Sequence, residues 1–156
     1  ALSNVTGLGK TFIPKGARVI PLVSEKADDY KAAGRAADAR LADFHWPLDL
    51  VLLGMGADGH TASIFPGPDF DEALNGPKER RALGVLPDPL PPEAPVARVT
   101  LSGAAIANAK SLMVAITGAE KRKVLETAIK QGASSAYPIG RVLAETELPV
   151  DVHWLE

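Results

Sequence analysis

A histidine and an aspartate lie two residues apart in a glycine-rich segment, residues 54–67, which reads GMGADGHTASIFPG. His60 is the natural proton carrier, because an imidazole exchanges protons near neutral pH and can act as base and then as acid in one reaction cycle. Asp58 is placed on a tight turn where it can orient the imidazole and stabilise its charged form. The pair therefore predicts general acid–base catalysis by His60 and Asp58.

Three glycines, Gly54, Gly56 and Gly59, surround this pair. Glycine permits a positive φ and exposes its backbone N–H to a ligand where a side chain would block the approach. We therefore expect Gly54, Gly56 and Gly59 to bind substrate.

Residues 54–67 can also be interpreted without catalysis, or as a nucleotide-binding motif. A glycine-rich turn often follows a strand without any function, and a lone histidine beside an aspartate is often only a surface pair. The dinucleotide-binding fingerprint G-x-G-x-x-G fails, because His60 follows Gly59 and no such motif opens a long helix. The full phosphate-binding loop pattern G-x-x-x-x-G-K-[ST] is also absent from the sequence.

A second candidate lies in residues 116–122, which read ITGAEKR. Lys121 falls in the first turn of a predicted helix, where the backbone N–H groups and the helix dipole already favour an anion. A lysine at such a position is often only solvated. Arg98 and Arg122 are further candidates for binding an anionic substrate.

The remaining polar candidates are interpreted as structural. Ser63 lacks the strained strand-to-helix elbow of G-x-S-x-G hydrolases. His45 and His153 lie in segments without polar neighbours, and no pair of histidines has the spacing of metal ligands. We therefore expect neither a metal nor a protein nucleophile.

Alternating apolar and amphipathic segments position these residues. Strands are expected at residues 18–22, 48–53, 83–86, 98–101, 111–116 and 150–155, and helices at residues 25–44, 103–109 and 119–131. Residues 66–95, rich in proline and charge, are expected to form a long surface connection. The alternation predicts an α/β fold with a mostly parallel sheet, whose ligands bind at the carboxyl ends of the strands.

The composition is that of an ordinary globular domain, with 156 residues, 46% hydrophobic and 23% charged. We expect a single domain over residues 1–156. The formal net charge of -2 provides no general attraction to nucleic acid or to a membrane, so an anionic substrate must be held locally. The chain contains no cysteine and no apolar run of about 18 to 20 residues, and we expect it to be cytoplasmic.

Residues 48–67 resemble the signature of the 6-phosphogluconolactonases. Three further parts match this family: Ser3-Asn4, residues 98–102 and residues 116–122. The resemblance spans nearly the whole chain. It implies a Rossmann-like three-layer α/β sandwich, shared with glucosamine-6-phosphate deaminases and ribose-5-phosphate isomerases. It also implies that Lys121 contacts a sugar phosphate.

The activity implied by the resemblance is hydrolysis of 6-phospho-D-glucono-1,5-lactone to 6-phospho-D-gluconate, in the oxidative pentose phosphate pathway and without metal or cofactor. Such hydrolysis needs a base for water, donors for the tetrahedral oxyanion and an acid for the departing ring oxygen. His60 suits the first and third roles, and backbone N–H groups of residues 54–59 suit the second.

Two alternatives to an active lactonase remain open. Family members begin with a strand, a glycine-serine-rich loop and an Asp-Glu-Arg-Trp-like segment, none of which precedes Ser3, so we expect this chain to be the C-terminal part of the lactonase fold. A non-catalytic remnant that binds sugar phosphate is therefore one alternative. A glucosamine-6-phosphate deaminase is the other, but its loop continues Gly-His-Ile-Ala-Phe-Asn-Glu-Pro, and this chain has Phe65 in place of that glutamate.

Overall fold

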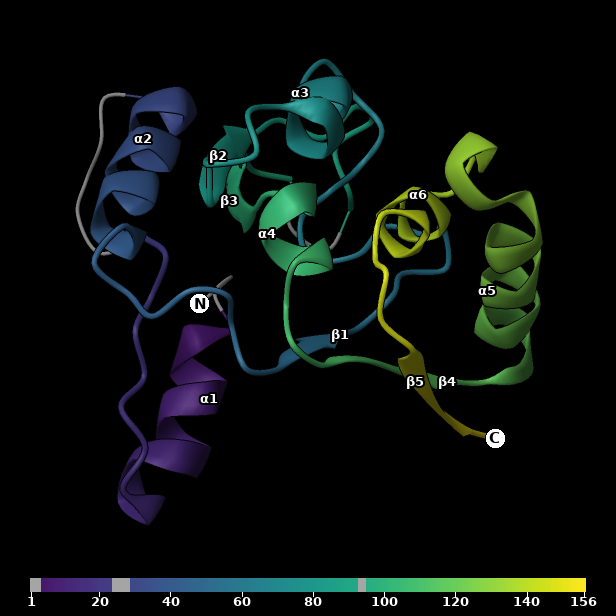
Figure 1. Ribbon diagram of the computed structural model, residues 1–156, viewed down its shortest axis with the longest axis horizontal. Coiled ribbons are helices and arrows are strands. Elements are labelled where there is room, and N and C mark those ends of the chain that lie inside the picture. Colours follow the sequence, from purple (N-terminus) through teal and green to yellow (C-terminus); the bar gives the residue numbers. More distant parts are fainter. Residues whose placement is uncertain (1–3, 24–28, 93–94) are drawn as a thin grey trace.

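The computed structural model describes residues 4–23, 29–92 and 95–156 (Figure 1). Its α-helices are α1 (Val5–Phe12), α2 (Tyr30–Leu41), α3 (Phe70–Asn75), α4 (Gly103–Ala107), α5 (Ala119–Gln131) and α6 (Pro138–Ala144). Its strands are β1 (Val51–Leu53), β2 (Ala82–Val85), β3 (Arg98–Leu101), β4 (Leu112–Thr117) and β5 (Val150–Leu155). Short 3-10 turns, η1 (Ile13–Lys15) and η2 (Gly132–Ser134), follow α1 and α5.

Strands β1, β4 and β5 form a parallel sheet in the order β1-β4-β5. The register pairs Leu53 with Val114 and Val114 with Val152. Each crossover between these strands contains helices, as parallel pairing requires. The predicted α/β class with a parallel sheet is confirmed.

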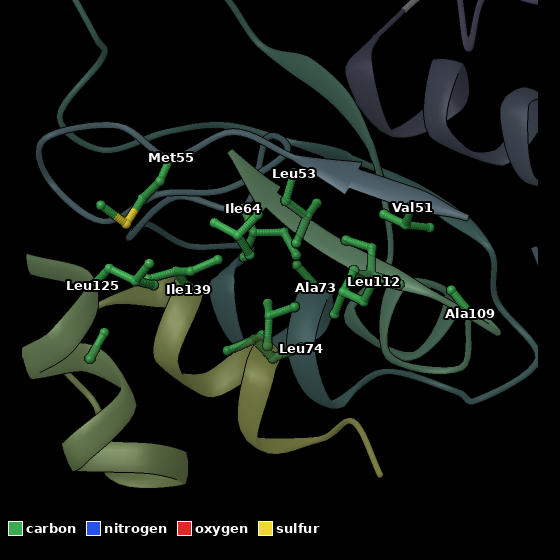
Figure 2. Close-up of a cluster of buried hydrophobic side chains, with 14 of the residues drawn as sticks. Val51, Leu53, Met55, Ile64, Ala73, Leu74, Ala109, Leu112, Leu125 and Ile139 are labelled. Carbon is green, nitrogen blue, oxygen red and sulfur yellow. The ribbon is translucent and has the colours of Figure 1, made fainter. Parts of the chain in front are cut away.

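One face of this sheet is buried by helices, and the other face is open. In Figure 1, α4, α5 and α6 lie on the same side of the sheet. Figure 2 shows Val51, Leu53 and Leu112 packed with Ile64, and helix residues such as Ile139 complete this core. On the open face Leu52 is 62% exposed and Leu155 is 70% exposed.

A second, antiparallel sheet, β2-β3, packs against α2, and two glycines bring the backbones together at the point of closest approach. A Cβ atom on Gly34 of α2 would overlap the backbone of Gly84 in β2, and a Cβ on Gly84 would overlap the carbonyl oxygen of Tyr30. Asp38 of α2 fixes the contact, since its carboxylate accepts hydrogen bonds from the backbone N–H of Arg81 (2.6 Å) and of Ala82 (3.1 Å).

A cluster of charges joins the start of α2 to α3. Lys31 Nζ lies 2.5 Å from Asp69 Oδ1 and 2.7 Å from Glu72 Oε2, and Arg80 also contacts Glu72. Asp69 is buried, and its other oxygen accepts the Leu86 N–H at 2.8 Å. The hydrogen bond from Lys31 is the main cause that holds the pKa of Glu72 below its ordinary value.

Several predicted elements differ from the structure. Residues 18–22 are not a strand, and the helix predicted from residue 25 begins at Tyr30 in the structure, where Asp29 caps it. Residues 25–28, the start of that prediction, lie outside the described residues. Helix α3 interrupts the predicted long connection, and α1 and α6 were not predicted.

Gly9-Lys10-Thr11 matches only the last three positions of the phosphate-binding loop pattern, and it lies inside α1. In a helix the backbone N–H groups bond to the preceding turn and cannot encircle a phosphate. This segment therefore does not form such a loop.

We expect the substitution Gly84→Ala to lower the free energy of unfolding by about 2 to 3 kcal/mol, because the added methyl group pushes α2 off β2. Urea denaturation followed by circular dichroism measures this loss. Gly7→Ala is the matched control: its methyl meets nothing within 4 Å, and we expect a change within about 1 kcal/mol. Equal losses in the two variants would contradict a close contact between α2 and β2.

We expect the contribution of Glu72 to the free energy of unfolding to depend on pH. Because its pKa is lowered in the folded state, its ion pairs stabilise the fold above the range in which a free glutamate titrates, about pH 4 to 5, and this is lost as the pH falls through the lowered pKa. The difference in urea midpoint between the wild type and Glu72→Gln should therefore shrink in acid. In a Lys31→Met background, most of this pH dependence should disappear; an unchanged profile would contradict the assignment.

Candidate functional site

The glycine-rich segment begins where β1 ends and folds into a compact loop closed by its own hydrogen bonds. The N–H of Gly56 donates to the carbonyl oxygen of His60 at 3.0 Å, and the N–H of Gly59 donates to that of Gly56, also at 3.0 Å. The buried hydroxyl of Thr61 donates to the Gly54 carbonyl at 2.8 Å. This local closure holds His60 at the carboxyl edge of the parallel sheet.

His60 and Asp58 form the pair that their spacing predicts. Asp58 Oδ1 lies 2.5 Å from His60 Nδ1 and also accepts the His60 backbone N–H at 3.1 Å. In the neutral imidazole, a carboxylate that accepts at Nδ1 favours the tautomer with the proton on Nδ1 and the lone pair on Nε2. The His60 side chain is 29% exposed, so that a ligand can reach the ring.

The three glycines of the loop differ in what surrounds them. A Cβ on Gly56 would overlap the His60 ring, and a Cβ on Gly59, whose φ is +78°, would lie 2.7 Å from Tyr137. Gly56 and Gly59 therefore make room for neighbouring rings, and their N–H groups are donated within the loop. Gly54 alone of the three has open space beside it.

Two side chains extend the His60 cluster beyond the local loop. The ring of Phe65 stacks on that of His60, with 4.0 Å between centroids and 22° between planes. The guanidinium carbon of Arg98, at the start of β3, lies 5.3 Å from the Phe65 centroid. Arg98, which the sequence suggested as a substrate-binding residue, therefore reaches the His60 cluster by its contact with Phe65.

Tyr137 is a neighbour of the site that sequence reasoning missed. It packs on Gly59, and the N–H of Ile139 donates to the Gly59 carbonyl at 2.9 Å. Pro138 at the first position of α6 is a helix-start signal that could have predicted the helix, but not its contact with the loop.

Lys121 lies in a separate pocket of about 470 Å³ at the carboxyl ends of β1 and β4. The pocket is lined by Gly54, Met55, Ala115, Ile116, Thr117, Lys121, His153, Trp154 and Leu155. Within the part of the chain that the structure describes, Lys121 forms no ion pair. His153, interpreted from the sequence as structural, is exposed and lines this pocket.

The other candidates are engaged elsewhere. Arg122 Nε donates to Glu126 at 2.8 Å, and its guanidinium carbon lies 4.6 Å from the Trp154 ring centroid, so its charge is already paired. The Ser63 N–H donates to the Thr100 hydroxyl at 3.1 Å. Over residues 4–23, 29–92 and 95–156, no group of three or more His, Asp or Glu side chains is arranged to hold a metal ion. In the same ranges, no helix is both long and apolar enough to span a bilayer.

Comparison with known proteins finds 6-phosphogluconolactonases among the similar curated sequences. A 6-phosphogluconolactonase of Mesorhizobium japonicum is 39% identical over 143 residues, which cover 90% of this chain and 56% of the relative. A 6-phosphogluconolactonase of Helicobacter pylori is 38% identical, over 88% of this chain and 56% of the relative. The chain thus spans a little over half the length of these curated relatives.

Solved structures agree with the sequence comparison. The crystal structure of a 6-phosphogluconolactonase from Shewanella baltica matches with a TM-score of 0.74 and 33% identity, over 86% of this chain and 55% of that one. A monomeric glucosamine-6-phosphate deaminase, with a TM-score of 0.59 and 21% identity, shares the fold. The family model described as glucosamine-6-phosphate isomerases/6-phosphogluconolactonase matches residues 2–154. The chain belongs to this family.

Proposed function

We propose that this chain carries the acid–base centre of a 6-phosphogluconolactonase, which hydrolyses 6-phospho-D-glucono-1,5-lactone to 6-phospho-D-gluconate. The observation that carries the proposal is the contact of 2.5 Å between Asp58 Oδ1 and His60 Nδ1, in the loop that follows β1. With Nδ1 bound to the carboxylate, Nε2 is the nitrogen left to act as the base. The names of the similar proteins support the same substrate.

In this mechanism His60 moves one proton twice. Nε2 takes a proton from water as the water oxygen attacks the lactone carbonyl carbon, and Asp58 stabilises the imidazolium that forms. The tetrahedral intermediate then collapses, the bond from carbon to ring oxygen breaks, and the imidazolium returns the proton to that oxygen. No covalent intermediate with the protein is needed. A positioned general base contributes roughly 100- to 10,000-fold to such a step.

The oxyanion of the intermediate requires N–H donors aimed at it. The N–H groups of Gly56 and Gly59 are donated to carbonyl oxygens inside the loop, so they do not serve. We assign the oxyanion to other backbone N–H groups of residues 54–59. Gly54, which lines the pocket of Lys121, provides the open surface along which the substrate approaches.

The substrate phosphate is assigned to Lys121. Its ammonium group has no carboxylate partner within the described ranges and lines the pocket that Gly54 also lines. Arg98 contributes a second positive charge on the side of Phe65. The two sites share the Gly54 backbone, whose carbonyl is held by Thr61 of the His60 loop.

A deaminase is the less supported alternative. Proton transfer between carbons in an aldose–ketose conversion uses an additional carboxylate to support the histidine. In this chain the residue at that position is Phe65, whose ring stacks on His60. Simple lactone hydrolysis does not need the carboxylate.

We expect the wild-type chain to accelerate proton release from freshly prepared 6-phosphogluconolactone above its spontaneous hydrolysis. His60→Ala should lower this acceleration by about 100- to 10,000-fold, because the base is lost. A pH-stat assay measures both rates. His45→Ala, at an exposed histidine outside the cluster, is the matched control and should keep the wild-type rate. Near-normal turnover by His60→Ala would refute the mechanism, and an inert wild type would favour a non-catalytic, sugar-phosphate-binding chain.

We expect Lys121→Ala to raise KM for the phosphorylated lactone with a smaller change in kcat, because the phosphate loses a charge partner that does not act on the reacting carbon. Steady-state kinetics on 6-phosphogluconolactone and on unphosphorylated gluconolactone separate the two effects. Lys123→Ala, an exposed lysine two residues later in α5, is the control and should leave both substrates unaffected. An equal loss on both lactones would argue against phosphate contact.

A further inference from the structure

The ring of Phe65 lies against the one side chain that the proposed reaction cannot do without. Its centroid is 4.0 Å from that of His60, and the two planes differ by 22°. This distance is shorter than the roughly 4.5 to 7 Å usual for aromatic pairs, so the two ring faces are in direct contact. The contact therefore restricts the plane of the imidazole as well as filling space.

The hydrogen bond to Asp58 does not fix that plane by itself. It holds one atom, Nδ1, and small rotations about the Cα–Cβ and Cβ–Cγ bonds of His60 can still tilt the imidazole when the carboxylate moves with it. The side chain of Asp58 is 55% exposed, so the carboxylate has little packing of its own to hold it. A second constraint on the ring is needed if Nε2 is to stay aimed at one place.

Phe65 is well suited to provide the second constraint because it is itself fixed. It is 7% exposed and follows the fully buried Ile64, whose N–H donates to the Thr61 carbonyl at 2.8 Å. The guanidinium of Arg98 also lies over the Phe65 ring, with its carbon 5.3 Å from the ring centroid. A cation over an aromatic face adds a favourable electrostatic contact.

We propose that Phe65 is a positioning residue: its buried ring, held by the core and by Arg98, sets the plane of the His60 imidazole so that Nε2 meets the attacking water. This inference rests on the proposed lactonase function for its catalytic consequence, but not for its geometry. Phe65 thus has a role of its own at the position where the deaminase pattern has a glutamate.

The chain contains a second phenylalanine in a similar contact, which provides a matched control. The guanidinium carbon of Arg141 lies 5.2 Å from the ring centroid of Phe70, which packs against the core. No ring of a histidine stacks on Phe70 among the described residues. The same substitution at Phe65 and at Phe70 therefore separates loss of the histidine contact from loss of a core aromatic ring.

The first test observes the His60 ring by proton NMR in the wild type, Phe65→Leu, Phe65→Met, Phe65→Tyr and Phe70→Leu. The stacked Phe65 ring should shift the carbon-bound ring protons of His60 upfield in the wild type. We expect this shift to persist in Phe65→Tyr and Phe70→Leu and to be lost in Phe65→Leu and Phe65→Met. Absence of the upfield shift in the wild type, or its persistence in a folded Phe65→Leu or Phe65→Met, overturns the inference.

The second test measures lactone hydrolysis by the same variants. We expect kcat to fall about ten- to a hundredfold in Phe65→Leu with little change in KM, since a misplaced group costs about that much. Phe65→Tyr should restore it, and Phe70→Leu should retain the wild-type kcat. If the wild type is inactive, the proposed function fails while the NMR test still decides the ring contact; if the ring shift is lost and kcat is unchanged, the positioning role fails while the function stands.

Discussion

The pairing of β1 with β4 is the constraint on which the site depends. Because the two strands are parallel and adjacent, the loop after Leu53 and the turn after Thr117 leave the sheet at the same edge. One segment carries the acid–base pair and the other leads to Lys121, although the residues lie about sixty positions apart in the sequence. The buried side chains of Leu53 and Val114, paired in the register, hold this edge on the helical core.

The geometry of the His60 loop depends on two of its glycines. Gly56 and Gly59 use their N–H groups to close the loop and use the absence of a side chain to admit the rings of His60 and Tyr137. They therefore shape the site more directly than they bind a ligand. The sequence pattern predicted a close approach at these glycines, and in the structure the rings of His60 and Tyr137 make that approach.

Elements with a strong local pattern were predicted well. The bounds of α5 and β5 agree with the structure, because helical spacing and strand alternation are properties of the segment itself. Helix α1 was missed because Gly7 and Gly9 lower its helical propensity, and none of its residues is buried. Residues 18–22 are apolar enough for a strand but find no strand partner among the described residues.

The site shows the same difference: contacts within one turn were predictable from the sequence, and contacts between distant elements were not. The contact between Asp58 and His60 was predictable because two residues of one turn must lie close together. The stack of His60, Phe65 and Arg98 joins the loop to β3, and the position of His153 beside Lys121 depends on how β5 pairs with β4. Such contacts are set by tertiary packing, for which a single sequence carries no local signal.

The open face of the parallel sheet has a consequence for colloidal behaviour. Leu52 and Leu155 expose apolar surface, and the outer edge of β1 has no strand partner within the described ranges. Faces and edges of this kind promote self-association. Asp151, which the register places beside Met113, is a charge within this face and opposes such association. Leu155 lines the Lys121 pocket, but Leu52 and Asp151 neither line it nor contact His60, so solubility can be tuned at these two positions while the acid–base pair stays unchanged.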